Sequence, residues 1–210
     1  MPRPTTPTLE PESPRALRAL ARTARAAEEW NVAADAMIRL AKVSTDDAER
    51  VALFFGLGEI FDAHIPDPRR AEAAWRRVLA LSPRDERTLV RLSDLYRRTG
   101  DTAREADAIQ SLATVLAPSP ERTERLLRLA AIAELPIGDL KRALTALEVA
   151  RRDNPADLRV LRAFRSFHER NHNPAAALAL VDRAIAEVRR ATEHDPRDVA
   201  SIARLSELLE

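Results

Sequence analysis

Apolar and polar residues follow one another along most of this chain with the period of an α-helix. The segment 85–99 shows the spacing at Leu89, Leu92, Leu95 and Tyr96. Steps of three or four residues place such side chains on one face of a helix. No segment alternates with period two over more than a few residues, and glycine is scarce. The pattern therefore predicts an all-α protein without a β-sheet.

Turn-forming residues divide this pattern into eleven predicted helices. An N-cap residue followed by a first-turn proline occurs at Ser13-Pro14, Asp67-Pro68 and Asn173-Pro174. A C-terminal glycine followed by an N-cap aspartate occurs at Gly100-Asp101 and Gly138-Asp139. The predicted helices span 14–28, 31–43, 45–63, 68–81, 85–99, 102–116, 119–134, 139–152, 156–170, 174–193 and 197–209.

The pattern also repeats at an interval of 72 residues. Equivalent pairs are Leu17 and Leu89, Leu20 and Leu92, Leu89 and Leu161, Ala71 and Ala143, Trp75 and Leu147, and Pro83 and Pro155. Each 72-residue repeat contains two helix pairs. A helix pair buries its apolar face only by stacking on its neighbours. We expect Trp30 and Trp75 in the core, and the closest helix contacts at Ala71, Ala106 and Ala143. Such a protein works by presenting a surface.

The helix pairs resemble the tetratricopeptide repeat. Its pattern is met most fully by Leu92-Ser93-Tyr96, Gly100-Asp101, Ala106, Ala113 and Pro118, and again by Leu129-Ala130-Ala133, Gly138-Asp139, Ala143, Leu147, Ala150 and Pro155. The resemblance implies a right-handed α-solenoid of about five helix pairs plus a C-terminal capping helix, over residues 14–210. The chain is also similar to the large repeat proteins of GC-rich bacteria. Residues 1–13 are predicted to form a disordered Pro/Thr-rich tail.

Composition narrows the function classes. The formal net charge is +1, so the whole molecule has no strong attraction to nucleic acid or anionic lipid. Cysteine is absent, which excludes disulfides and thiolate metal sites. No apolar run approaches the ~20 residues of a membrane span, and the N-terminal segment lacks the apolar core of a signal peptide. We therefore expect a cytoplasmic protein without a membrane association.

One short motif permits an enzymatic interpretation. The segment His168-Glu169-Arg170-Asn171-His172 fits the H-E-x-x-H pattern of zinc hydrolases, which needs both histidines on one helical face. The repeat register places His172 where Gly100 lies in the preceding unit, in a turn. No phosphate-binding loop and no nucleophile motif is present. We expect no catalytic residue, no metal and no cofactor.

The remaining signal is the face of each first helix that points away from the packing positions. In tetratricopeptide-like arrays this face lines the concave surface. The candidate binding residues on it are Phe55, Glu59, Asp62, Arg87, Val90, Asp94, Arg97, Leu127, Glu134, Arg159 and Arg162, and Arg15, Arg18, Arg22 and Arg25 occupy the same face of the first helix. Phe55, Val90 and Leu127 either form an apolar strip in a groove or complete the packing between helices.

These observations favour a non-enzymatic scaffold that binds a peptide or protein segment in its concave groove. RNA binding through the arginine-rich faces is the main alternative, although RNA recognition usually needs aromatic stacking platforms and aromatic residues make up only 4% of the chain. A metal-dependent hydrolase using the 168–172 segment is the third interpretation. The sequence does not identify the partner.

Overall fold

The structure is a computed structural model that describes residues 13–155 and 157–173, together with 175, 179, 182, 185, 186 and 190. All regular secondary structure in these residues is helical, as the sequence predicts. The predicted helices at 174–193 and 197–209 lie outside the described residues, apart from six single positions. The predicted tail at 1–13 also lies outside them, except for Ser13.

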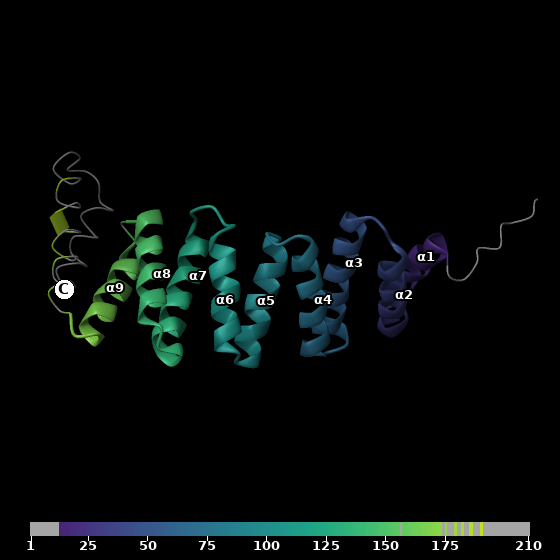
Figure 1. The fold of residues 1–210 in the computed structure, drawn as a ribbon, viewed down its shortest axis with the longest axis horizontal. Helices are drawn as coiled ribbons and strands as arrows, with labels where there is room; N and C mark the ends of the chain where they lie inside the picture. The colour runs from purple at the N-terminus through teal and green to yellow at the C-terminus, as the bar shows by residue number, and fades with distance from the viewer. Residues whose placement is uncertain are drawn as a thin grey trace, which may run out of the picture. The chain divides into compact units, whose positions relative to one another are not determined.

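The described helices follow one another along the chain with short connections (Figure 1). They are α1 (Pro14–Ala26), α2 (Trp30–Val43), α3 (Asp47–Glu59), η1 (Ile60–His64), α4 (Pro68–Leu81), α5 (Glu86–Thr99), α6 (Thr102–Ala113), α7 (Pro120–Ile132), η2 (Ala133–Ile137), α8 (Leu140–Asp153) and α9 (Leu158–Arg170). The first nine predicted helices are confirmed, with ends that differ by less than one turn.

Two short π-helices, η1 and η2, are absent from the sequence prediction. Each continues the first helix of a pair and ends just before an aspartate that caps the next helix. The backbone N–H of Asp67 donates to the carbonyl of Phe61 (2.8 Å), and that of Asp139 donates to the carbonyl of Ala133 (2.7 Å). The two bonds join equivalent residues of the 72-residue repeat. The same wide turn is therefore built twice.

Side-chain capping defines where the helices begin. The carboxylate of Asp67 accepts from the backbone N–H of Arg70, and that of Asp139 accepts from Arg142. Ser13 and Asp101 cap α1 and α6 in the same way. The caps predicted at these positions are confirmed, and each satisfies a backbone donor that the helix cannot satisfy itself.

The residues with a left-handed backbone show the 72-residue repeat most clearly. Glu28, Gly100 and His172 have φ values of 59°, 75° and 57°, and successive members are 72 residues apart. All three follow the end of a first helix. Only Gly100 adopts this conformation without a Cβ penalty. The turn geometry is thus kept even where the sequence does not supply glycine.

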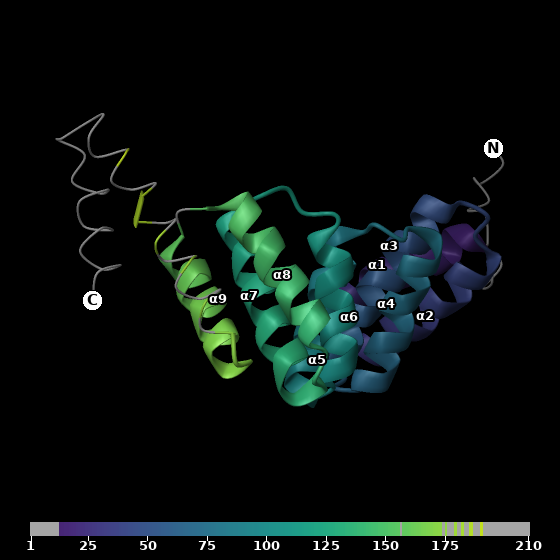
Figure 2. The ribbon, with the colours of Figure 1, turned by 60° about the vertical axis from the view of Figure 1, so that its left-hand side comes forward.

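The chain divides into two compact units, residues 1–108 and 109–210. In the first unit, α1 packs on α2 and α3 packs on α4 as neighbouring pairs (Figures 1 and 2). Its core contains Phe54, Phe61 and Trp75. The indole of Trp75 lies against Gly58, where a Cβ atom would collide with Nε1 and its neighbouring ring atoms. Gly58 therefore makes room for the ring.

The second unit has a core of smaller side chains. Here α7 packs on α8, and α8 contacts α9 (Figure 2). Leu126, Leu129 and Leu147 are buried between α7 and α8, and Phe164 and Phe167 are buried on α9. The alanines expected at close helix contacts, Ala71, Ala106 and Ala143, are fully buried in their respective helices.

Two expected core positions differ from the sequence interpretation. Leu20, the counterpart of the buried Leu92, is 40% exposed, because α1 has no earlier helix among the described residues to pack against. Ala21 and Ala24 are buried instead. Trp30 is only half-buried, and its ring stacks on the exposed imidazole of His64 with centroids 3.6 Å apart.

Candidate functional site

All the charged side chains on the exposed face of α1 are basic. Arg15, Arg18, Arg22 and Arg25 are all exposed, and the helix contains no acidic residue. The buried side of α1 is formed by Leu17, Ala21 and Ala24, so the arginines point away from the core by helical periodicity. This places a concentrated positive charge on the first-helix face of the first unit.

A cavity of about 500 Å³ lies beside these arginines, between α1, α2 and α3. It is lined by Arg18, Ala21, Arg22, Arg25, Met37, Leu40, Glu49, Ala52 and Leu53. The lining therefore combines an apolar floor with a charged rim. A hollow of this size accommodates one or two side chains of a partner segment.

One wall of this cavity is fixed by an ion pair. Nε and Nη2 of Arg18 donate to the two carboxylate oxygens of Glu49 at 2.5 and 2.9 Å, and the hydroxyl of Ser44 donates to Glu49 at 2.6 Å. The Arg18 guanidinium and the Ser44 hydroxyl lower the pKa of Glu49 to about 2. Arg22 and Arg25, in contrast, make no side-chain ion pair within the described part of the chain. They remain available to an anionic partner group.

The predicted apolar strip begins at Phe55 and Val90 in the first unit. Both side chains are half-buried, and Phe55 packs against the core while Arg87 places its guanidinium 4.7 Å from the ring centroid. Phe55 thus contributes to packing and keeps part of its ring at the surface. In the second unit, the candidate residue Leu127 is also half-buried on α7.

Most of the charged candidate residues of the first unit are paired between helices. Glu59 binds Arg91 (3.3 Å), and Asp62 binds Arg98 (2.5 Å). Each pair joins the end of α3 or η1 to α5. Asp94 contacts Arg97 one turn further along α5 (3.2 Å). These charges connect consecutive first helices as well as bordering the face.

The second unit repeats one of these pairs. Glu134 accepts from Nε and Nη2 of Arg170 at 3.0 and 2.7 Å and from the amide of Asn171 at 3.0 Å. The Arg170 guanidinium lowers the pKa of Glu134. Glu134 and Arg170 lie 72 residues after Asp62 and Arg98.

The other two candidate arginines of the second unit lie exposed on α9. Arg159 pairs with Asp157 at 2.7 Å, and Arg162 points from the same helix.

Sequence reasoning placed the carboxylates on the face but missed their partners Arg91, Arg98 and Arg170. The available signal was a spacing of 36 residues, one helix pair, between Asp62 and Arg98 and between Glu134 and Arg170. Residues one repeat apart lie side by side when the repeats stack. The cavity beside α1 was not predicted, because it depends on how side chains fill space.

The histidine motif lies across the end of α9. His168 is on the helix, with its ring centroid 5.0 Å from that of Phe164. His172 follows the last helical residue and has a left-handed backbone, so the prediction that it lies in a turn is confirmed. The two imidazoles do not share one helical face. Among the described residues, no group of three or more His, Asp or Glu side chains is placed to hold a metal ion.

Within the described part of the chain, none of the helices combines the length and apolar character needed to cross a lipid bilayer.

Comparisons with known proteins support the fold. No protein-family model matches the sequence, and no curated protein is similar to it at a significant level. Among solved structures, MamA (AMB-1) matches 90% of this chain and 96% of its own length with a TM-score of 0.53 and 17% identity. Another MamA structure matches 89% of this chain and 97% of its own, with a TM-score of 0.51 and 14% identity.

A solved structure whose name states its repeat type is also similar. A tetratricopeptide repeat protein from Parabacteroides merdae matches 93% of this chain and 72% of its own length, with a TM-score of 0.51 and 15% identity. At such identities the similarity shows the fold and no shared partner. This similarity agrees with the helix pairs, their caps and their buried alanines. The chain has the fold of a tetratricopeptide repeat protein.

Proposed function

We propose that this chain is a non-enzymatic scaffold that binds an extended or helical segment of a protein partner on its first-helix faces. The observation that carries the proposal is the surface of the first unit around α1 and α3. There a cavity of about 500 Å³ with an apolar floor lies beside Arg22 and Arg25. An apolar patch with a charged rim is the usual composition of a recognition surface.

The candidate residues divide into two roles under this proposal. Phe55, Val90 and Leu127 are half-buried and supply apolar contact area, which carries most of the affinity at such surfaces. Arg87 and Arg97 lie exposed on α5 of the first unit, and Arg159 and Arg162 lie exposed on α9 of the second. Rim charges of this kind set orientation and association rate more than affinity.

The same surface supports a protein partner better than RNA. Arg18, Arg91 and Arg98 are held by carboxylates, which reduces the positive charge available to a phosphate backbone. Phe55, the ring on this face, is partly covered by Arg87. We propose that the chain is cytoplasmic and that its partner is a protein.

Affinity capture from native cell extract with mass spectrometry tests this function. The baits are the parent chain, the Arg22→Glu/Arg25→Glu variant and the Arg69→Glu/Arg152→Glu variant. The last is a matched control, since it makes the same change of net charge at exposed positions on α4 and α8. We expect the parent and the control to retain a common protein that the first variant loses. Equal retention by all three baits, or recovery of RNA alone, would contradict the proposal.

A further inference from the structure

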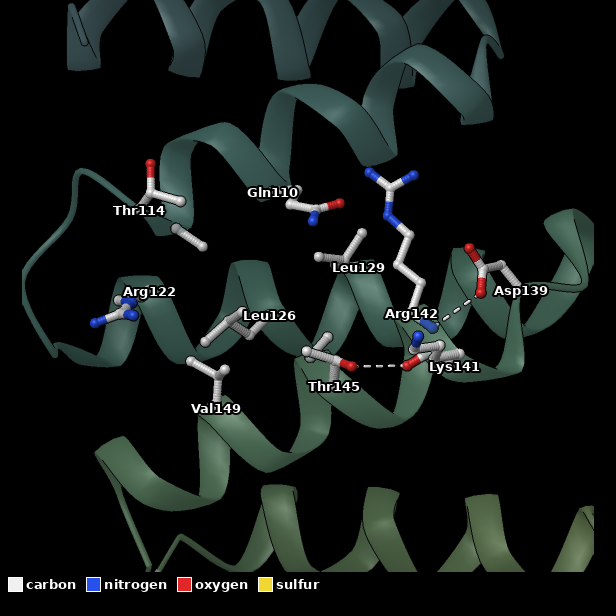
Figure 3. A pocket seen from close by; sticks show the side chains of 12 residues that line it. Gln110, Thr114, Arg122, Leu126, Leu129, Asp139, Lys141, Arg142, Thr145 and Val149 are labelled. Atoms are coloured by element: carbon white, nitrogen blue, oxygen red, sulfur yellow. Dashed lines mark hydrogen bonds between the residues drawn. The ribbon is translucent and has the colours of Figure 1, made fainter.

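A second cavity of about 500 Å³ lies wholly within the second unit, between α6, α7 and α8 (Figure 3). Its lining consists of Gln110, Ala113, Thr114, Arg122, Leu126, Leu129, Asp139, Lys141, Arg142, Thr145, Ala146 and Val149. Two of its three walls are second helices of their pairs. The cavity is therefore distinct from the first-helix face on which the proposed function rests.

The repeat explains why space is left here. Residues 72 positions earlier fill the equivalent place in the first unit with a ring, because Phe54 stands at the position of Leu126. Arg77, the counterpart of Val149, places its guanidinium 5.3 Å from the centroid of Phe54. In the second unit both the ring and the cation above it are replaced by smaller aliphatic side chains.

A neighbouring ring of the first unit is also absent from the second unit. In the first unit Arg70 lies 3.9 Å above the ring of Phe61. In the second unit the equivalents are Arg142 and Ala133, so the arginine is kept and the ring is lost. Arg142 borders the cavity and extends from α8 toward α6 in Figure 3. In the first unit Arg70 and Arg77 thus lie over the rings of Phe61 and Phe54, whereas their counterparts in the second unit, Arg142 and Val149, line a hollow.

The charge of the lining is positive. Arg122, Lys141 and Arg142 face one carboxylate, Asp139, which caps α8 by accepting from the backbone N–H of Arg142 at 2.9 Å. Arg122 lies 3.2 Å from Asp153 and is held by it. Lys141 is exposed, and its ammonium makes no ion pair with the rest of the described chain. An anionic ligand group therefore finds at least one uncommitted cation at the rim.

Polar groups in the lining suit a peptide backbone. Gln110 is exposed on α6 and lies beside the hollow in Figure 3, where its amide can both donate and accept. Thr145 donates its hydroxyl hydrogen to the carbonyl of Lys141 at 2.9 Å, which leaves oxygen lone pairs to accept from a ligand N–H. The floor between these groups is formed by Leu126, Leu129 and Ala146.

We propose that this cavity binds a segment of a partner protein that presents one aromatic side chain flanked by acidic residues. The aromatic ring occupies the hollow beside Leu126, where the first unit has the larger Phe54, and Arg142 lines the same hollow. The acidic residues pair with Lys141 at the rim. Cation–π contact and charge pairing then act on the same short segment.

A synthetic peptide tests this binding site directly. The probe is fluorescein-labelled Asp-Glu-Phe-Glu-Asp with blocked ends, titrated with the full chain and followed by fluorescence anisotropy at low and physiological salt. We expect binding that weakens at least about tenfold when the phenylalanine is replaced by alanine or the acids by their amides. No binding of the probe at millimolar protein, or equal binding of all three peptides, overturns the proposal.

Variants of the chain locate the site. Lys141→Glu repels the acidic residues, and Leu126→Phe fills the hollow as the first unit does. Each is expected to weaken binding at least about tenfold. Lys42→Glu is the matched control, since Lys42 is the other lysine of the chain and is exposed on α2. If Leu126→Phe does not fold, Val149→Phe fills the hollow from a half-buried position without changing the charge. Unchanged affinity in Lys141→Glu and in the filled variant contradicts the site.

Discussion

One helix contact is built twice in this molecule, from side chains of different size. In the first unit α3 and α4 meet where Trp75 lies against Gly58. In the second unit the equivalent positions hold Leu147 and Ala130, both buried between α7 and α8. The first unit thus pairs a large indole with a glycine, and the second unit pairs the smaller Leu147 with the methyl group of Ala130. The backbone repeat is kept while the volumes are redistributed.

This difference extends to the place of the cavity in each of the two units. The first unit has Phe54, Phe61 and Trp75 in its core, and its cavity lies on the face that carries the arginines of α1. The second unit lacks rings at all three equivalent positions and has its cavity beside Arg142 instead. A repeat therefore fixes where helices lie, and the side-chain volumes decide where the surface is hollow.

The largest effect should come from replacing Trp75 and Gly58 by the residues at the equivalent positions of the second unit. Trp75→Leu alone should destabilise the chain by about 2–4 kcal/mol, because it leaves a cavity opposite Gly58. Gly58→Ala alone should destabilise it by about 1–3 kcal/mol, because the new methyl group overlaps the indole. In the Trp75→Leu background the same Gly58→Ala change should stabilise by about 0.5–1 kcal/mol, because alanine favours the helix.

Urea denaturation of the four proteins in this cycle measures the free energies of unfolding. The informative result is the sign of the Gly58→Ala effect in the two backgrounds. If that change destabilises both backgrounds equally, the contact of the first unit is not the counterpart of the Leu147–Ala130 contact.

A second test concerns a position at which the two units are the same. Ala143 is fully buried, as is its counterpart Ala71, so Ala143→Leu should destabilise by about 1–3 kcal/mol through overpacking. Glu148→Leu on the same helix is the control, because Glu148 is exposed and the change should stay within about 0.5 kcal/mol. Melting curves of both variants provide the check. An unchanged melting temperature for Ala143→Leu would show that the register is wrong.

The left-handed turn positions give a smaller effect with opposite signs. Gly100→Ala should cost about 1 kcal/mol, whereas His172→Gly should stabilise by a few tenths to about 1 kcal/mol, because glycine relieves the Cβ clash. His172→Ala keeps the clash and should leave stability and zinc content nearly unchanged. Chemical denaturation measures each change. Destabilisation by His172→Gly would indicate that its turn differs from the turn at Gly100.

The smallest effect is the pH dependence of the Arg18–Glu49 pair. Glu49 has a pKa of about 2 in the folded chain against an ordinary value of 4.5, so its contribution is present above pH 4.5 and is lost as pH falls toward 2. The pair is partly exposed, so we expect less than about 1 kcal/mol. Glu49→Gln should remove this part of the acid sensitivity while retaining the Ser44 contact. An identical pH profile of stability in parent and variant would argue against the pair.

The sequence was sufficient for the features that depend on local chemistry and periodicity. Caps at Asp67 and Asp139, the turn at His172 and the buried alanines follow from residue type and helical spacing. The π-helices were not predictable in this way, because one inserted residue leaves the apolar pattern almost unchanged. The exposure of Leu20 was missed because the repeat pattern does not say which helix lacks a neighbour.

The candidate surfaces were predicted less completely. The first-helix face stays a prediction as a binding surface, and the pairing of Asp62 with Arg98 shows that charges on it also join helices. Neither cavity was predicted. The cavity of the second unit lies where Leu126 replaces Phe54, and such a difference in side-chain volume can be interpreted only when the packing of the helices is known.

Calorimetric titration of the captured partner with the parent chain and with the Phe55→Ala/Leu127→Ala variant tests directly whether the first-helix faces bind it. Circular dichroism and thermal unfolding first establish that the variant remains folded. If the first-helix faces bind the partner, the loss of two apolar contacts should cost about 2 kcal/mol or more, which is about thirtyfold in affinity. A folded variant that binds as tightly as the parent would contradict the account.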